Sequence, residues 1–220
     1  MSHLFDLPLE ILVDITQFLS TKDILNLSLC SKYLRDILYA IKINDKVEFD
    51  KISGLNYFDS FTNVVYRKSG NVFSKSLYVL NWMCKENLPS KLPDSLKSLH
   101  LGCYYNQPLL QLPDSLKNLH LGHYYNHLLP QLPDPLKSLH LSSYYNQTLP
   151  QFPDSLKSLH LSHYYNQTLP QLPDSLKSLH LGYDYNKPLP QLPNSLRLLK
   201  IYRGFLLPTL SSNITIEFFG

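Results

Sequence analysis

Apolar residues recur along most of the chain at a fixed spacing of 20 residues. The unit reads LPDSLKSLHLGCYYNQPLLQ at residues 92–111, and further copies begin at Leu112, Leu132, Phe152 and Leu172, with a degenerate copy at Leu192. Self-similarity at this period indicates a solenoid in which each repeat forms one coil. Because one coil cannot bury its own apolar face, the coils are expected to stack into a continuous core.

Each copy carries the pattern Leu-x-x-Leu-x-Leu, and its second half alternates between apolar and polar positions. Alternation with a period of two predicts a short strand with one face inward. In the first copy, Leu99 and Leu101 are therefore expected to face the core. Ser98, His100 and Gly102 are expected to face outward.

The remainder of each coil is predicted to be irregular. The Leu-Pro-Asp start excludes a helix interior, because proline lacks the amide donor and restricts the preceding residue to extended geometry. Asn106 follows the predicted strand where the chain must turn, and asparagine suits such turns. The equivalent residues from Asn106 to Asn186 can also form a buried amide ladder. Leu109 and its equivalents form a further column that we expect to face inward.

These residues resemble a known family of repeats. The pattern Leu-x-x-Leu-x-Leu followed by Asn is similar to the leucine-rich repeat, although Asn lies five residues after the last Leu here. The form LPxSLxxLxLxxxYNQPLP resembles the FNIP repeat, a short leucine-rich-repeat variant. The resemblance implies a β-rich solenoid that serves as a binding scaffold. The alternative, a disordered proline-rich tract, is disfavoured because such tracts lack periodic Leu columns.

The N-terminal segment shows helical periodicity instead. Leu12, Ile15 and Leu19 recur at helical spacing, and Ser20 with Thr21 can end that helix and cap the next one. Three short helices in about 35 residues cannot bury much surface alone. The segment carries more apolar residues than such a bundle can hide, so we interpret it as a docking element.

The same segment resembles the F-box, through LPLEIL at residues 7–12 and KDILNLSLCSKYLRDI at residues 22–37. In that family the Leu-Pro start and the apolar helix faces pack on the Skp adaptor of cullin-RING ubiquitin ligases. The resemblance implies that the adaptor-binding residues are Leu7, Pro8, Ile11, Leu12, Ile15, Leu19, Leu25 and Tyr33. The alternative is that these residues only close a small core under the solenoid.

The predicted fold class is α+β, with a small N-terminal three-helix F-box followed by a leucine-rich-repeat-like β-solenoid of ~20-residue coils. We expect an F-box at 1–45, irregular capping repeats at 46–91, five regular FNIP-type repeats at 92–191, and a degenerate repeat with a C-terminal cap at 192–220. Leu80 and Trp82 repeat the spacing of the regular strands within the first cap. Alternation at Ile216 and Phe218 predicts a closing edge strand.

Two columns of the repeat carry candidate functional side chains, and we interpret them as a target-binding surface because Tyr in particular suits interfaces. They are His100, His120, His140, His160 and His180 in one column, and Tyr104, Tyr124, Tyr144 and Tyr164 in the other. Zinc can bridge neighbouring imidazoles, but a flat ladder offers mostly parallel ligands, so no metal site and no cofactor are predicted. A further alternative is a surface residue merely copied by duplication.

Composition narrows the function further. The net charge is +3, and a Lys column is offset by an Asp three residues earlier, so we interpret this face as solvated and expect no nucleic-acid partner. No apolar run reaches the ~18 residues of a membrane span, and no signal peptide is apparent, so we expect an intracellular protein, cytoplasmic or nuclear, with no membrane partner. No P-loop, dinucleotide-binding or HExxH motif is present, so no catalytic residue is predicted.

The combined resemblance implies the substrate-recognition subunit of a Skp–cullin–F-box ubiquitin ligase, which is not itself an enzyme. Its partners would be a Skp-type adaptor with its cullin complex and an unknown protein target. Two alternatives remain: an adaptor-binding decoy or non-ligase interaction scaffold, and a metal-binding protein that uses the His column. F-box domains joined to FNIP repeats are typical of giant DNA viruses of amoebae and of their amoebal relatives, so a viral form would act on host ubiquitination.

Overall fold

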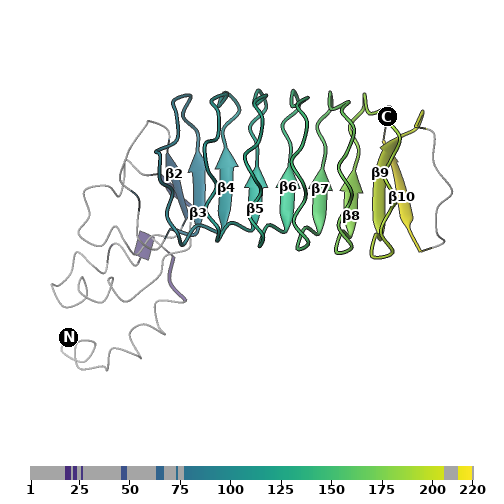
Figure 1. Ribbon diagram of the computed structural model, residues 1–220. Helices are drawn as coiled ribbons and strands as arrows, with labels where there is room; N and C mark the ends of the chain where they lie inside the picture. Colours follow the sequence, from purple (N-terminus) through teal and green to yellow (C-terminus); the bar gives the residue numbers. More distant parts are fainter. Residues whose placement is uncertain are drawn as a thin grey trace.

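The computed structural model describes residues 18–20, 22–23, 26, 46–48, 63–66, 73, 77–205 and 213–219. Ten strands within these ranges form one parallel sheet, and their order in space is their order in the sequence (Figure 1). The strands are β1 (Val47–Glu48), β2 (Asn63–Tyr66), β3 (Val79–Trp82), β4 (Ser98–Leu101), β5 (Asn118–His120), β6 (Ser138–His140), β7 (Ser158–His160), β8 (Ser178–His180), β9 (Leu198–Tyr202) and β10 (Thr215–Phe219). The predicted leucine-rich-repeat-like β-solenoid is confirmed.

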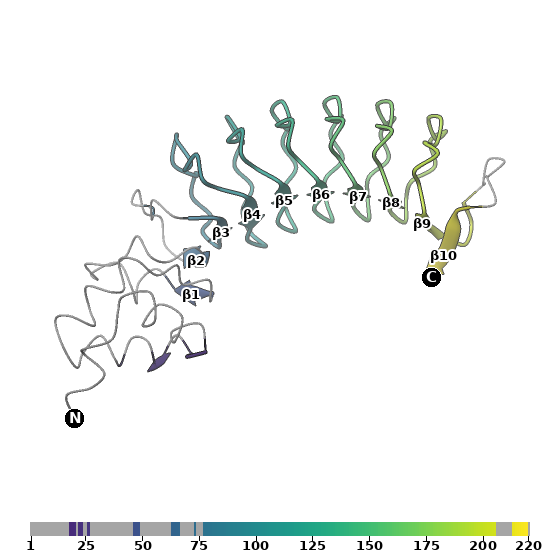
Figure 2. The same cartoon turned by 90° about the horizontal axis from the view of Figure 1, so that it is seen from below.

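Equivalent repeat positions pair with each other throughout the sheet. Leu139 of β6 lies opposite Leu119 of β5 and Leu159 of β7, and His140 lies opposite His120 and His160. The solenoid bends into an arc whose strands lie toward the concave side and whose proline-containing returns lie on the convex side (Figure 2). A residue repeated every coil therefore forms a straight column across the molecule.

The core consists of leucine columns, as the alternation predicts. Leu99 and Leu101 are buried, and their equivalents in the following coils are buried too. The column that begins at Leu109 is buried in three coils and becomes half-buried at Leu169 and Leu189. The predicted cap at β3 contributes Leu80 and Trp82, both fully buried.

The column expected to be buried after each strand is not asparagine but tyrosine. Tyr105 and its equivalents at 125, 145, 165 and 185 are buried, with ring centroids 6.2 to 6.3 Å apart along the column. The side chain of Asn106 is exposed. The asparagine ladder exists, but it lies at the surface: Asn106 Oδ1 accepts the backbone N–H of Asn126 at 3.0 Å. The buried ring fills interior space that the smaller amide side chain of asparagine would leave empty.

Gly102 and its equivalents are buried, so the outward orientation expected for this position is wrong. The strand alternation ends at Leu101, and the next residue turns toward the preceding coil. A Cβ atom at Gly122 would overlap the carbonyl oxygen of Gly102. Ser142 occupies the same repeat position, is buried, and donates a hydrogen bond from its hydroxyl to the carbonyl oxygen of Tyr125 at 2.5 Å.

Serine hydroxyls join neighbouring coils just before five of the strands, β4, β5, β7, β8 and β9. Ser175 Oγ donates to the carbonyl oxygen of Leu156 in the preceding coil at 2.6 Å, and Ser95, Ser115, Ser155 and Ser195 do the same in their coils. In the third regular copy this position is Pro135, which has no hydroxyl to donate. These bonds fix neighbouring coils at one register.

The C-terminal end of the sheet is formed by β10. The alternation around Phe218 correctly predicted β10, which pairs with β9 along its whole length. Phe218 is 53 % exposed because no further coil of the described chain covers it. Near the N-terminus, Ser20 Oγ accepts the backbone N–H of Asp23 at 3.2 Å, the contact expected of a helix cap.

Most of the residues implied in adaptor binding lie outside the described residues, namely Leu7, Pro8, Ile11, Leu12, Ile15, Leu25 and Tyr33. Leu19 is described, and it is half-buried against the hydrophobic core. That contact is the one expected for Leu19 if it helps to close a core next to the solenoid. Among the described residues, no helix has the length and apolar character needed to span a membrane.

Candidate target-binding face

The strands carry one histidine each in β4 to β8, and these five residues form the histidine column: His100, His120, His140, His160 and His180. Strand pairing places each of them directly opposite the next. Asn81 of β3 lies opposite His100, and Lys200 of β9 lies opposite His180. The column therefore crosses the outward face of the sheet without interruption.

The rings of the histidine column lie closer together toward the C-terminal end. The centroids of His100 and His120 are 5.8 Å apart, whereas those of His140 and His160 are 3.9 Å apart and nearly parallel. The centroids of His160 and His180 are also 3.9 Å apart, but their planes are inclined by 56°. This inclination brings the two Nδ1 atoms to 3.1 Å from each other. The ladder is therefore not flat along its whole length.

Residues of β9 and β10 enclose the last histidine. The ring of Phe219 meets that of His180 edge to face, with centroids 5.0 Å apart. Lys200 Nζ lies 2.6 Å from Glu217 Oε2, so the positive charge beside the column has a carboxylate partner. The terminal strands thus hold the C-terminal end of the column in place.

Burial lowers the pKa of every histidine in the column. The pKa of His140 falls to about 4 and that of His160 to about 3, first because burial disfavours the charged imidazolium and second because neighbouring histidines repel it. The pKa of His100, His120 and His180 is also lowered, again chiefly by burial. At neutral pH the column is therefore an uncharged, aromatic strip.

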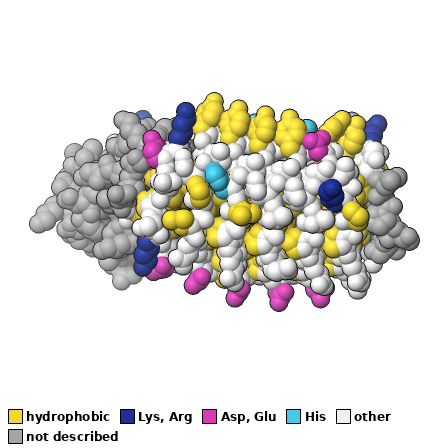
Figure 3. Space-filling view, turned by 45° about the horizontal axis from the view of Figure 1, so that its top comes forward, with side chains coloured by type: hydrophobic (Ala, Val, Ile, Leu, Met, Phe, Trp, Pro, Cys, Tyr) yellow, Lys and Arg dark blue, Asp and Glu magenta, His cyan; other side chains and the backbone are white. Residues whose placement is uncertain are grey.

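A second row of aromatic side chains follows the ends of the strands. This tyrosine ridge consists of Tyr104, Tyr124, Tyr144, Tyr164 and Tyr183. Tyr104 is 63 % exposed, and the other four are 42 to 43 % exposed. Neighbouring rings from Tyr104 to Tyr164 have centroids 5.0 to 5.7 Å apart. Figure 3 shows hydrophobic side chains in a row along the edge of the solenoid at which the strands end.

Two further histidines join the ridge to the rest of the face. His123 lies edge to face against Tyr124 and Tyr144, with centroids 4.8 and 5.1 Å away. His163 stacks on Tyr183, with centroids 5.1 Å apart and planes inclined by 2°. In the fifth copy, Tyr183 takes over from the Tyr104 position because that position holds Asp184. Tyr183 was not predicted as part of this face, although the exchange is visible in the sequence as YDY in place of CYY.

The histidine column and the tyrosine ridge meet in one hollow. It has a volume of about 360 Å³, and its lining includes His140, His160 and His180 from the column, Tyr183 from the ridge, and Phe219. This hollow brings three of the predicted target-binding residues, His140, His160 and His180, together with Tyr183. Within the described part of the chain, no three His, Cys, Asp or Glu side chains gather as ligands for a metal ion.

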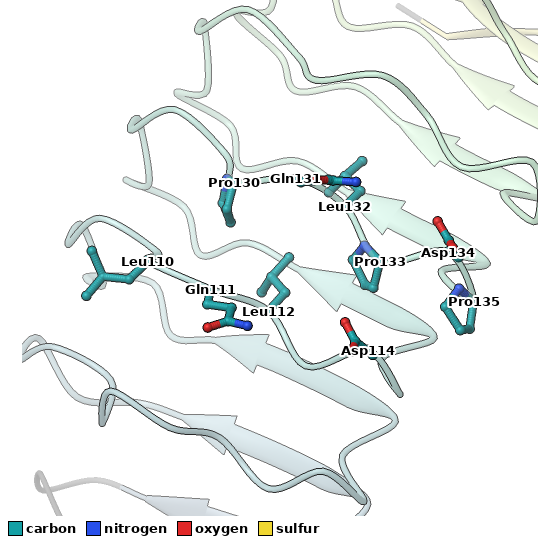
Figure 4. Close-up of a pocket in the computed structure, with 10 residues that line it drawn as sticks. All are labelled: Leu110, Gln111, Leu112, Asp114, Pro130, Gln131, Leu132, Pro133, Asp134 and Pro135. Atoms are coloured by element: carbon teal, nitrogen blue, oxygen red, sulfur yellow. The ribbon is translucent and has the colours of Figure 1, made fainter.

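The other faces of the solenoid carry different chemistry. Acidic side chains line the edge opposite the ridge, where Asp94, Asp114, Asp134, Asp154 and Asp174 are exposed (Figure 3). On the convex side, a hollow of about 580 Å³ is lined by prolines, Leu110, Leu112, two glutamines, Asp114 and Asp134 (Figure 4). Asp114 and Asp134 are the charged residues of its lining, and no histidine lines it.

Comparison with known families identifies two segments. A model of the F-box domain matches residues 4–45, and a model of the FNIP repeat matches residues 86–124, 105–144 and 165–203. The F-box match contains all eight residues implied in adaptor binding, and the repeat matches contain most of the histidine column and the tyrosine ridge. No curated protein matches the chain.

Two solved structures share the fold. CroV588, described as a novel circular LRR protein, comes from a giant virus and is 25 % identical over 73 % of this chain, with a TM-score of 0.55. YopM from Yersinia enterocolitica is 24 % identical over 72 % of this chain, with a TM-score of 0.57. This chain covers 34 % and 37 % of those chains, so it spans about a third of their length. These likenesses establish a leucine-rich-repeat-like solenoid.

Proposed function

The chain carries an F-box domain and FNIP repeats, and we propose that it is a substrate-recognition subunit of a Skp–cullin–F-box ubiquitin ligase. The observation that carries the proposal is the F-box match at residues 4–45, immediately before a sheet that begins at Val47. An F-box implies binding of a Skp-type adaptor. An F-box joined to repeats is also typical of non-catalytic adaptor proteins.

The two parts of the chain have separate roles in this proposal. The N-terminal residues 1–45 dock on the adaptor through the apolar residues around Leu7 and Pro8. The solenoid presents its concave face to a protein target. Stacked coils joined by serine and asparagine hydrogen bonds make a rigid support, which holds a target at a fixed distance from the ligase. Residues 46–91 and 192–220 cap the regular repeats at the two ends.

The chemistry of the concave face suits a protein target. The tyrosine ridge offers exposed rings that are already ordered by stacking, so their immobilisation costs little on binding. The neutral histidine column next to it supplies hydrogen-bond donors and acceptors with no net charge at pH 7. A surface of this kind favours a partner with apolar and polar groups over a strongly charged one.

Co-purification tests the adaptor contact. Pro8→Ala combined with Ile11→Asp places a carboxylate in an apolar docking surface, so this double variant is expected to lose the adaptor. His100→Gln, which changes only the solenoid face, is the matched control and retains the adaptor. Retention of the adaptor by a folded double variant contradicts the F-box role.

Reconstituted ubiquitination separates a ligase subunit from a decoy. Proteins captured by the full chain from a host-cell extract are identified by mass spectrometry, with Tyr144→Ala plus Tyr164→Ala as the variant that loses the target but keeps the adaptor. The proposal is supported if the ligase modifies a captured target in the presence of the wild-type chain. The Pro8→Ala plus Ile11→Asp variant and the Tyr144→Ala plus Tyr164→Ala variant should both fail to support this modification. Adaptor binding with no modified target points to the decoy or scaffold alternative.

A further inference from the structure

One pair in the histidine column differs from all the others. His160 and His180 are the column members whose ring nitrogens lie within hydrogen-bond distance, with Nδ1 atoms 3.1 Å apart. The ring centroids of His140 and His160 are just as close, but these two rings are nearly parallel and stacked. The planes of His160 and His180 are instead inclined by 56°, and an Nδ1 atom of one ring lies next to an Nδ1 atom of the other.

This separation fits a metal ion held by both rings. A zinc–imidazole bond is about 2.0–2.1 Å long, so two nitrogens 3.1 Å apart would enclose an angle of roughly 98° at a shared ion. That angle lies between the octahedral and the tetrahedral values. We propose that His160 and His180 bind one divalent transition-metal ion of the zinc class through their Nδ1 atoms. The proposal does not rest on the ligase role.

The surroundings leave room for the ion and its water ligands. The two histidines line the hollow of about 360 Å³ on the concave face. Phe219 packs edge to face on His180 and holds its ring. The nearest cation in the column, Lys200, is paired with Glu217 and so repels a bound cation less than a free ammonium would. Among the described residues no third protein ligand is gathered there, so the two histidines would supply two ligands and water would have to supply the others.

Without metal, the 3.1 Å contact is a hydrogen bond between two neutral rings, in which one Nδ1–H donates to the other Nδ1. Metal binding requires a lone pair on both Nδ1 atoms. The proton of the donating ring therefore moves to Nε2 of the same ring, so that each imidazole stays neutral with a proton on Nε2. No proton is released overall and no other group has to change.

Zinc titration of the full chain tests the proposal. Calorimetry with Zn²⁺ is expected to show one saturable site in the wild type, and long-range ¹H–¹⁵N spectra of the imidazoles should place Zn²⁺ on Nδ1 of two histidines. His160→Gln and His180→Gln each leave one protein ligand for the ion in place of two. Each should therefore lower the association constant for Zn²⁺ about tenfold or more. His100→Gln is the control and leaves binding unchanged, because its ring lies 5.8 Å from its neighbour.

Three results overturn the proposal. The first is a wild-type protein with no saturable Zn²⁺ binding. The second is equal affinity in wild type and in both substituted proteins, which would place the ion elsewhere. The third is a spectrum in which Zn²⁺ shifts other histidines, or Nε2 atoms, in place of the Nδ1 atoms of this pair. The wild-type spectrum decides even if a substituted protein fails to fold.

Discussion

Asn146 Oδ1 accepts the backbone N–H of Asn166 at 2.9 Å, and this contact ties one coil to the next on the surface of the solenoid. Asn146 Oδ1 also accepts Gln167 Nε2 at 3.2 Å. Asn146→Ala removes the acceptor for both donors, so we expect a loss of about 1 kcal/mol in the free energy of unfolding. Urea denaturation measures it.

Asn146→Asp is the matched control, because a carboxylate oxygen accepts the same two hydrogen bonds. At pH 7 the Asp variant is expected to retain most of the stability that the Ala variant loses. Equal destabilisation by both substitutions would show that the side-chain amide, and not the acceptor oxygen, matters at this position.

Stacking makes a leucine in the middle of the solenoid more important than an apolar residue at its edge. Leu139 is buried between the equivalent leucines of β5 and β7, so Leu139→Ala is expected to cost about 2–5 kcal/mol. Ile216 of the edge strand β10 packs on β9 alone and is half-buried, so Ile216→Ala should cost clearly less. Similar shifts of the two denaturation midpoints would argue against a stacked core.

Much of this fold was predictable from the sequence because a repeat amplifies a weak local signal. A single Leu-His-Leu segment says little, but its recurrence at the same spacing predicted β4 to β8 and their pairing. The alternation at Ile216 and Phe218 likewise predicted β10. The F-box was recognised from residues that mostly lie outside the described part of the chain, so its contacts remain predictions.

The sequence pattern did not predict features that depend on how neighbouring coils pack against each other. Tyr105 and Asn106 are adjacent and both recur in all five regular copies, so the pattern alone did not decide which one is buried. In the folded chain the ring of Tyr105 is buried and the side chain of Asn106 is exposed. The inclination of His160 against His180 was also beyond the pattern, because identical residues at identical spacing gave no reason to expect unequal ring geometry.

Gly122 supplies a test of the turn that was misjudged. Its missing side chain allows the carbonyl oxygen of Gly102 to approach, and an added Cβ would overlap that oxygen. Gly122→Ala is therefore expected to destabilise the protein by about 1–3 kcal/mol, the usual range for an overpacked site. Thermal unfolding followed by circular dichroism measures the change.

Ser142 provides the comparison for Gly122, because it holds a side chain at the same repeat position. Ser142→Ala keeps the Cβ atom and loses only the hydrogen bond to the carbonyl oxygen of Tyr125. Its cost should be about 1 kcal/mol, from the lost bond and the unpaired carbonyl. If Gly122→Ala is neutral, the coil has adopted the backbone seen at Ser142, and the close approach to Gly102 is not required.

The histidine column makes the stability of the metal-free protein depend on pH. The pKa of His140 is lowered from 6.5 to about 4 and that of His160 to about 3, so below pH 6.5 the unfolded chain binds protons that the folded chain does not. Stability then rises with pH. The contribution is fully present above pH 6.5 and is lost as pH falls through the window toward 4 and 3.

Replacement of His120, His140 and His160 with Gln tests this dependence in buffer that contains a chelator. The triple variant keeps a polar face but lacks three of the titrating rings, so its denaturation midpoint should fall less than that of the wild type between pH 7 and about 5, above the range in which most carboxylates titrate. The charged groups that face the column, Lys46, Lys200 and Glu217, are the same in both proteins and cancel in the comparison. Parallel curves for the two proteins would mean that these imidazoles are as hydrated in the folded chain as in the unfolded one, and that the column is not the partly desolvated strip that its lowered pKa values imply.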